Sequence, residues 1–126
     1  MAKENPPKLT RRSLPPEVRL SVKAGQDKKA EDIVVLDLRE VSTFTDFFVI
    51  VTGNSTRQNK AIYESIEQEL KKSRLMPIGV EGRDLAEWIL IDYGSFVVHV
   101  FSKQARGYYS LEKLWGDAPR LFFAER

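Results

Sequence analysis

Two nearly continuous apolar runs, residues 33–38 (IVVLDL) and residues 46–53 (DFFVIVTG), constrain the fold more strongly than any other feature of the chain. Both are rich in β-branched and aromatic residues and have the length of a strand. A strand with one face in water alternates apolar and polar residues, and neither run alternates. We therefore expect two strands inside a sheet that is covered on both faces.

The segment after the second run predicts the firmest helix of the chain. Ser55 and Gln58 have the spacing of a capping box, in which the serine hydroxyl accepts from the Gln58 backbone N–H and the Gln58 amide reaches back. Apolar residues then recur at every fourth position: Ile62, Ile66 and Leu70. This spacing gives the helix one core-facing stripe. A short strand at 76–82 completes a strand–helix–strand unit, which favours a right-handed crossover onto one sheet.

Two weaker helices are also expected. One spans about residues 15–32, with Ser13 as its cap and Pro15 in its first turn. The other is short, begins at Leu111 and ends at Gly116.

These elements predict one α/β domain at residues 15–118, built as a mixed sheet of about five strands flanked by helices. A length of 126 residues suits a single domain with a substantial core. Residues 1–14 have the composition of a flexible basic tail, and residues 119–126 are expected to be a C-terminal tail.

A β-hairpin is predicted around Gly94-Ser95, because glycine followed by a small polar residue is typical of a two-residue turn. The turn fixes the opposing pairs as Trp88 with Phe101, Leu90 with His99, Asp92 with Val97, and Tyr93 with Phe96. Since side chains alternate between faces, one face is purely apolar and the other is mixed. Asp92 and His99 are diagonal neighbours on the mixed face, within reach of a side-chain or water-bridged contact.

His99 is the only histidine and has three interpretations: a catalytic base, a ligand, or a core residue with satisfied hydrogen bonds. Ser95, Asp92 and His99 have the residue types of a catalytic triad, but Ser95 falls in the turn and no nucleophile elbow surrounds it. Residues 52–58 (TGNSTRQ) could bind an anion before a helix, yet they lack the glycine–lysine pair of a phosphate loop. The strand that follows carries no pair of carboxylates for magnesium. We therefore expect no enzyme activity.

The composition excludes several kinds of site. The absence of cysteine rules out disulfides and cysteine-ligated zinc, and a single histidine rules out a multi-histidine metal site, so no metal or cofactor is expected. A net charge of +2 gives no case for charge-driven nucleic-acid binding. No apolar run approaches a membrane span, and the N-terminus has no hydrophobic signal region, which favours a cytoplasmic protein.

Aromatic residues gather in the last third of the chain, and Trp88 is the most informative of them. It shares the mixed hairpin face with Asp92 and His99, whereas Phe101 and Trp115 are interpreted as core. Tryptophan beside charged groups is typical of binding hot spots. The pattern therefore favours an interface role for Trp88.

Three segments, DKKAEDIVVLDL, TDFFVIVTGNSTRQ and GVEGRDLAEWILIDYGSFVVHVFSKQARGYYSLEKLWGDA, closely resemble the ribosomal silencing factor family (RsfS, also called Iojap). The likeness covers about residues 17–118 in the right order and spacing. It implies a mixed α/β sheet distantly like that of nucleotidyltransferases, without their activity.

The resemblance also implies a partner. Family members bind ribosomal protein L14 on the large subunit, block joining of the small subunit, and so repress translation when nutrients are short. Organelle relatives act in large-subunit assembly, and free members are often homodimers. An active nucleotidyltransferase-like enzyme or hydrolase, a large-subunit assembly factor, and a dimeric scaffold that ignores ribosomes are the alternatives.

The family's partner-binding tryptophan matches Trp88, and its apolar residue after the aspartate, often leucine, matches Tyr93. We expect Trp88 and Tyr93 to be apolar anchors, with Asp92 and His99 forming the polar part of the same surface. The remaining residues expected at this surface are Val97, Phe101 and Tyr109.

Overall fold

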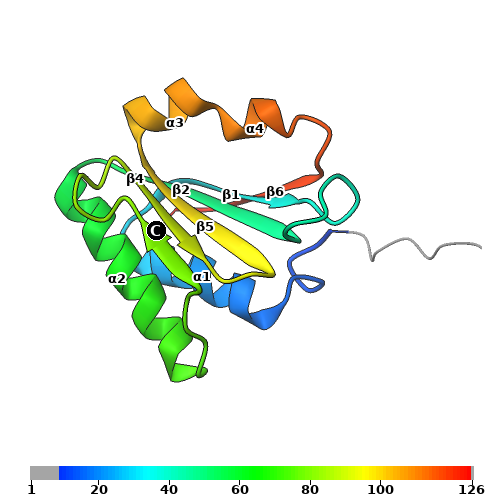
Figure 1. Ribbon diagram of the computed structural model, residues 1–126, viewed down its shortest axis with the longest axis horizontal. Helices are drawn as coiled ribbons and strands as arrows, with labels where there is room; N and C mark the ends of the chain where they lie inside the picture. The colour runs from blue at the N-terminus through cyan, green and yellow to red at the C-terminus, as the bar shows by residue number, and fades with distance from the viewer. Residues whose placement is uncertain (1–8, 126) are drawn as a thin grey trace, which may run out of the picture.

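A six-stranded mixed sheet forms the centre of the computed structural model, which describes residues 9–125 (Figure 1). The strands are β1 (Glu31–Asp37), β2 (Phe47–Gly53), β3 (Gly79–Glu81), β4 (Trp88–Asp92), β5 (Phe96–Ser102) and β6 (Arg120–Phe123). Their order across the sheet is β3-β4-β5-β2-β1-β6. Of these neighbours, β2 and β5 run parallel, and the other pairs are antiparallel. The α/β fold class is therefore confirmed, with six strands instead of about five.

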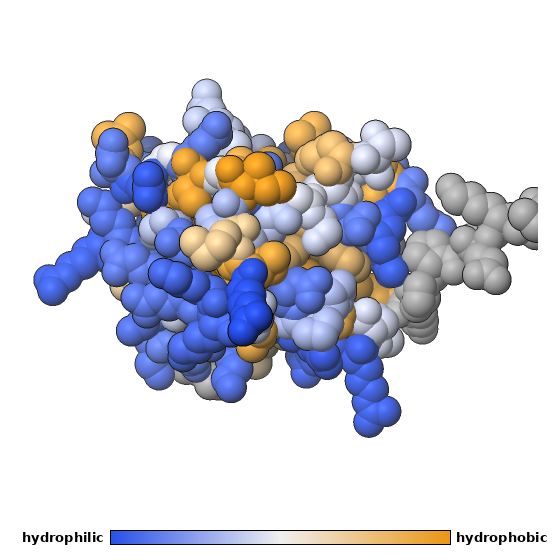
Figure 2. All heavy atoms as spheres, turned by 60° about the horizontal axis from the view of Figure 1, so that its bottom comes forward, coloured by the Kyte–Doolittle hydropathy of each residue, from blue (hydrophilic) through white to orange (hydrophobic). Residues whose placement is uncertain are grey.

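Helices cover both faces of the sheet, as the continuous apolar strands predicted (Figure 1). The larger layer contains α1 (Pro16–Asp27) and α2 (Thr56–Lys72), which pack on the sheet around a fully buried core. The opposite face carries the short helices α3 (Lys103–Tyr109) and α4 (Leu111–Leu114) over a second apolar cluster. In Figure 2, which brings the α1–α2 side forward, hydrophilic side chains dominate the lower part of the molecule. Both long helices thus bury one stripe and leave the other in water.

The capping box at the start of α2 is confirmed in one half and altered in the other. The Gln58 backbone N–H donates to Ser55 Oγ at 3.0 Å, as predicted. The Gln58 side-chain oxygen accepts from Asn54 N–H at 2.6 Å, one residue before the cap. The Gln58 amide nitrogen donates to the carbonyls of Lys28 and Lys29. The same side chain therefore caps α2 and holds the end of α1 beside it.

Helix α1 ends at Asp27, earlier than the predicted boundary at residue 32. Lys29 adopts a left-handed conformation with φ of 63°, and the Ala30 and Lys29 N–H groups donate to the carbonyls of Gly25 and Gln26. This is the hydrogen-bond pattern of a Schellman cap, a position where glycine is the usual residue. Because lysine occupies that position, the sequence gives no signal that the helix ends there. β1 begins shortly afterwards, at Glu31.

Residues Arg120–Phe123 form β6, so the segment predicted to be a C-terminal tail begins inside the domain, which corrects the predicted boundary at residue 118. β6 pairs with β1 in antiparallel register, with Leu121 opposite Val35. At the other end, Leu14 is buried in the main core, so the domain begins before residue 15. The part of the predicted N-terminal tail at residues 1–8 lies outside the described residues.

The helix α3 was not predicted, although its start carries a recognisable cap. Ser102 Oγ accepts from the Ala105 N–H at 3.1 Å, which satisfies one free donor at the helix start. Arg106 then fixes the α3–α4 layer to the sheet. Its guanidinium donates to the Asp32 carbonyl, to Thr52 Oγ1 at 2.8 Å and to a Glu112 carboxylate oxygen at 3.0 Å.

Candidate partner-binding surface

The predicted hairpin forms with the predicted register. Trp88 lies opposite Phe101, Leu90 opposite His99, and Asp92 opposite Val97. Gly94 has φ of 87°, as a two-residue turn with glycine first requires, and Tyr93 N–H donates to the Phe96 carbonyl at 3.0 Å. The turn chemistry therefore sets which side chains share the mixed face.

The β3–β4 end of this face is only partly covered. Along β4, Ile89 and Ile91 are fully buried against the α1–α2 layer, whereas Trp88, Leu90 and Asp92 are half-buried on the other side. The second apolar cluster lies under α3 and α4, and Trp88 and Leu90 pack at its border. The hairpin thus presents apolar side chains to solvent beside a closed core.

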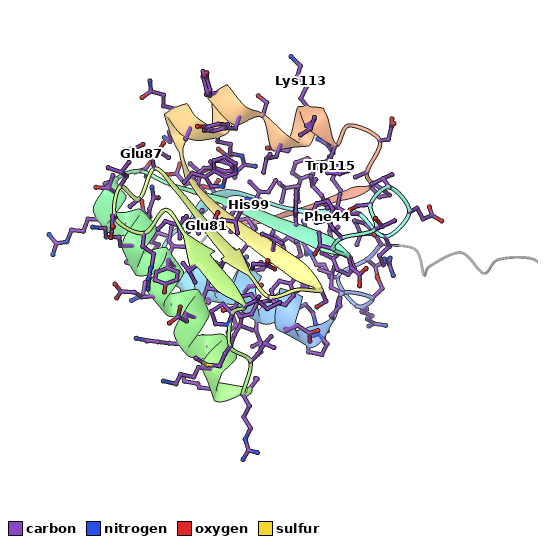
Figure 3. All side chains as sticks on the ribbon, in the orientation of Figure 1. Phe44, Glu81, Glu87, His99, Lys113 and Trp115 are labelled. Atoms are coloured by element: carbon purple, nitrogen blue, oxygen red, sulfur yellow. The ribbon has the colours of Figure 1, made fainter. Side chains whose placement is uncertain are left out.

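We define the open hairpin face as Glu81, Trp88, Leu90, Asp92 and Tyr109. Glu81 lies opposite Leu90 in the β3–β4 register and so shares its face. Tyr109 reaches over from α3, with its ring 4.5 Å from that of Trp88, and remains 48% exposed. In Figure 3, Glu81 and Glu87 lie on the β3–β4 side of His99, and Phe44 and Trp115 lie on the other side.

Trp88 is held in place by three aromatic neighbours. Its ring stacks on Phe101 with centroids 5.0 Å apart, and Tyr109 contacts it from α3. The indole Nε1–H donates to His99 Nδ1 at 3.0 Å. Packing and a hydrogen bond together therefore fix one orientation of the indole.

His99 is a core residue and not part of the exposed surface. The side chain is 3% exposed and contacts the rings of Phe48, Trp88 and Phe101. Because an indole nitrogen only donates, Nδ1 must be the unprotonated nitrogen, and the proton of the neutral ring is on Nε2. Burial lowers the pKa of His99 to about 3, so the ring stays neutral at physiological pH.

The direct side-chain contact predicted between Asp92 and His99 is wrong. Asp92 Oδ1 accepts from the Gly94 backbone N–H at 2.8 Å and so stabilises the turn. His99 Nδ1 is occupied by Trp88, and Nε2 has no hydrogen-bond partner among residues 9–125. The diagonal neighbour on β4 in the other direction, Trp88, takes the place that was expected for the aspartate.

The structure also separates Tyr93 from the open hairpin face. Its ring is 6% exposed, stacks on Phe96 at 4.9 Å and belongs to the core under α1 and α2, which is the opposite face of the sheet. Val97 and Phe101 lie on the expected face but are buried, so they can act only from beneath. Contact of Tyr93, Val97 and Phe101 with a partner stays a prediction. In this conformation the buried ring of Tyr93 cannot contact a partner that binds the open hairpin face.

Among residues 9–125, the side chains that each enzyme hypothesis requires are not arranged as a site. Ser95 lies exposed in the turn, and His99 Nδ1, the nitrogen through which a triad histidine bonds its aspartate, accepts from the Trp88 indole instead. At the start of α2, the N–H groups of Asn54 and Gln58 already donate to side chains, which leaves fewer donors for an anion. Residues 9–125 contain no group of three side chains that could hold a metal ion, and no helix in that range is long and apolar enough to cross a bilayer.

A second exposed aromatic region, around Phe44, was not predicted from the sequence. Phe44 is 63% exposed, with its ring 6.1 Å from Trp115, and residues 39–44 and Trp115 line a groove of about 680 Å³. Trp115 was interpreted as core, yet it is only half-buried. A phenylalanine between threonines in a loop, at residues 43–45, was the available signal.

Gly82 is required for the approach of the β3–β4 connection to Trp88. The residue has φ of 84°, and a Cβ built there would lie 1.9 Å from the Trp88 carbonyl oxygen. No other residue type fits this position without displacing the start of β4.

Several known proteins are similar to this chain in sequence. A family model described as "Ribosomal silencing factor during starvation" matches residues 11–125. "Ribosomal silencing factor RsfS" of Bacillus subtilis is 45% identical over 102 residues, which cover 81% of this chain and 86% of the relative. "Mitochondrial assembly of ribosomal large subunit protein 1" of Mus musculus is 34% identical over 102 residues, or 79% of this chain and 45% of that protein.

Solved structures agree with the sequence relatives. A crystal structure of a Chromobacterium violaceum protein superposes with a TM-score of 0.78 at 35% identity, covering 86% of this chain and 90% of that one. A Bacillus halodurans structure gives a TM-score of 0.73 at 42% identity, covering 82% and 94%.

Proposed function

This chain belongs to the ribosomal silencing factor family, and we propose that it binds ribosomal protein L14 on the large subunit through the open hairpin face. Bound there, it occupies the surface that the small subunit must meet and represses translation when nutrients are limiting. The mechanism is steric and involves no chemistry, cofactor or metal.

The observation that carries this proposal is the half-buried Trp88, held rigidly at the border of a closed core. An aromatic side chain that is already ordered loses little conformational entropy on binding, which is a property of hot-spot residues. Leu90 and Tyr109 extend the apolar area on either side of it. The geometry therefore suits a partner with a matching apolar recess.

The charges around Trp88 indicate the kind of partner surface. Glu81 and Asp92 lie on the same face, and Glu87 directly precedes Trp88. Carboxylates at the rim of an apolar patch favour a partner with lysine or arginine around its recess. The association rate should then fall as salt is added, because rim charges steer encounter more than they hold the complex.

The test is co-sedimentation of the purified chain with large ribosomal subunits. Trp88→Ala should remain folded by circular dichroism and bind at least thirtyfold more weakly, since losing such an anchor costs about 2 kcal/mol or more. Phe44→Ala is the matched control, because Phe44 is an exposed aromatic at the far end of the same sheet face. A folded Trp88→Ala chain that sediments like the unaltered one would contradict the proposal.

A role in large-subunit assembly is the second candidate, and the name of the mouse relative favours it. The two roles separate in cells that lack the protein. Silencing predicts normal large subunits and excess translation under starvation, whereas assembly predicts incomplete large subunits during growth. Purified mature subunits also discriminate, because only silencing requires the chain to stop them from joining small subunits.

We also infer that free chains pair as homodimers in the cytoplasm before they meet the ribosome. The half-buried Trp88 and Leu90 and the exposed Tyr109 of the open hairpin face would be covered in such a pair. Sedimentation equilibrium over a range of concentrations tests this directly. A chain that stays monomeric at 100-fold dilution and at high concentration alike would exclude the dimer.

A further inference from the structure

We propose that His99 is a positioning residue for Trp88: by accepting the indole N–H on Nδ1, it fixes the ring and removes its only donor from the surface. The partner then meets Trp88 as an apolar plane and makes no hydrogen bond to it. This inference rests on the proposed function for the identity of the partner, but its structural part can be tested without the ribosome.

Three contacts leave the indole little freedom. Phe101 stacks on it at an interplanar angle of 29°, and Tyr109 lies 4.5 Å away at 45°. These two rings restrict the tilt of the indole, but apolar contacts alone do not distinguish one rotation about χ2 from the flipped one. The hydrogen bond to His99 Nδ1 does, since only one orientation brings Nε1 within 3.0 Å of it.

His99 is itself rigid, so it can act as a reference for its neighbour. It lies in a buried strand between Leu90 on β4 and Ile50 on β2. Its ring meets Phe48 edge-on with centroids 4.4 Å apart and is parallel to Phe101 within 10°. A buried imidazole packed on these sides cannot follow a moving indole, and therefore the indole follows it.

The arrangement carries a cost that a purely structural side chain would avoid. Nε2, which bears the proton, has no hydrogen-bond partner among residues 9–125. An aliphatic residue at this position would remove that unsatisfied donor and is a residue type common in buried β-strands. A histidine there is explained by what its other nitrogen does for Trp88.

The consequence for recognition concerns the chemistry of the partner. An exposed tryptophan normally offers an N–H donor to a carbonyl or carboxylate on the other side. Here that donor is satisfied within the chain, so a partner with an acceptor aimed at Nε1 gains nothing. The recess that receives Trp88 should be lined by aliphatic or aromatic carbon, with its basic groups at the rim beside Glu81 and Asp92.

A matched pair of substitutions tests the inference. Asparagine places an acceptor oxygen where histidine has Nδ1, and leucine has nearly the same shape as asparagine but no acceptor. His99→Leu should be the more stable of the two, because His99→Asn buries an amide. The two explanations therefore predict opposite orders of affinity. If His99 positions Trp88, His99→Asn should bind more tightly than His99→Leu, because only asparagine keeps the acceptor. If His99 only packs, His99→Leu should bind more tightly, because it is the more stable variant.

The first readout is hydrogen exchange of the indole N–H groups by NMR, with Trp115 as the internal reference. The Trp88 signal should exchange slowly in the unaltered chain and in His99→Asn, and quickly in His99→Leu, with Trp115 unchanged. The second readout is affinity for purified large ribosomal subunits. His99→Leu should bind roughly three- to tenfold more weakly, the range expected when one ordered side chain is set free, and His99→Asn should recover most of the loss.

Two results would overturn the inference: an unprotected Trp88 indole in the unaltered chain, or full binding by His99→Leu. If the unaltered chain does not bind subunits at all, the proposed function fails, and the exchange comparison alone decides whether His99 fixes the ring. Trp88→Phe gives an independent check. It keeps the apolar plane and lacks the donor, so it should bind better than Trp88→Ala and within about tenfold of the unaltered chain.

Discussion

The burial of a neutral His99 makes the stability of the fold depend on pH in a direction that can be worked out. In the unfolded chain the imidazole has an ordinary pKa of about 6.5. In the folded chain burial lowers that pKa to about 3, and the side chains in ring contact with it, Phe48, Trp88 and Phe101, carry no charge. Between these two values the unfolded chain binds a proton at His99 and the folded chain does not.

Since the unfolded state binds more protons in this window, the free energy of unfolding must fall as the pH falls. There is no contribution above pH 6.5. Below it, the loss approaches about 1.4 kcal/mol for each pH unit and levels off near pH 3. From pH 6.5 to pH 4.5 the loss from this one group is therefore roughly 2–3 kcal/mol, a large part of the stability of a domain of this size.

The assay is urea denaturation followed by circular dichroism at pH 7.5, 6.5, 5.5 and 4.5, on the unaltered chain and on His99→Leu. Carboxylates titrate in both proteins, so their effects cancel in the difference between the two free energies. We expect that difference to be constant above pH 6.5 and to shift in favour of His99→Leu below it. A difference that stays flat from pH 7.5 to pH 4.5 would show that His99 takes up its proton in the folded state, and the buried neutral ring would be refuted.

Three further outcomes follow from other parts of the structure. Gly82→Ala forces a side chain against the Trp88 carbonyl at a positive φ, and we expect it to lower the free energy of unfolding by about 2–3 kcal/mol in urea titrations, with Gly79→Ala as a harmless control in open space. Tyr93→Phe should leave stability equal or about 0.5–1 kcal/mol higher by the same measurement, because the buried Tyr93 hydroxyl has no hydrogen-bond partner among residues 9–125. Arg106→Met removes the side chain that ties α3 and α4 to the sheet and should cost about 2 kcal/mol or more, with faster amide exchange confined to those helices.

The parts of the fold that could be predicted from the sequence depend on strong local signals. Gly94-Ser95 sets the hairpin register, and the Ser55–Gln58 spacing sets the start of α2. The end of α1 could not be predicted, because Lys29 takes the left-handed position that glycine usually occupies, and Arg74 takes the same conformation just after α2. The left-handed backbone of each residue is modestly strained, and the surrounding hydrogen bonds offset that strain. Lysine and arginine as residue types give no signal of this conformation.

β6 was missed for a different reason. Its four residues, from Arg120 to Phe123, are too few to show a period, and only half-buried or exposed side chains occupy them. The strand exists because β1 offers an edge whose backbone groups need partners, with Val35 and Leu36 already in place. Such an element is dictated by tertiary contact, and the local sequence only has to permit it.

The candidate site shows where alternation of side chains stops being informative. The two-residue period of a strand assigned Trp88, Asp92 and His99 correctly to one face, but it does not tell how deeply each side chain is buried on that face. His99 is one strand closer to the centre of the sheet than Trp88, and the α3–α4 layer covers that strand, so His99 is buried where Trp88 is only half-buried. Which of its two diagonal neighbours His99 bonds depends on their other partners. Asp92 accepts from the Gly94 N–H of its own turn, and the single donor of the Trp88 indole is directed at His99 Nδ1. The lone histidine thus acts on the surface through the tryptophan that lies over it.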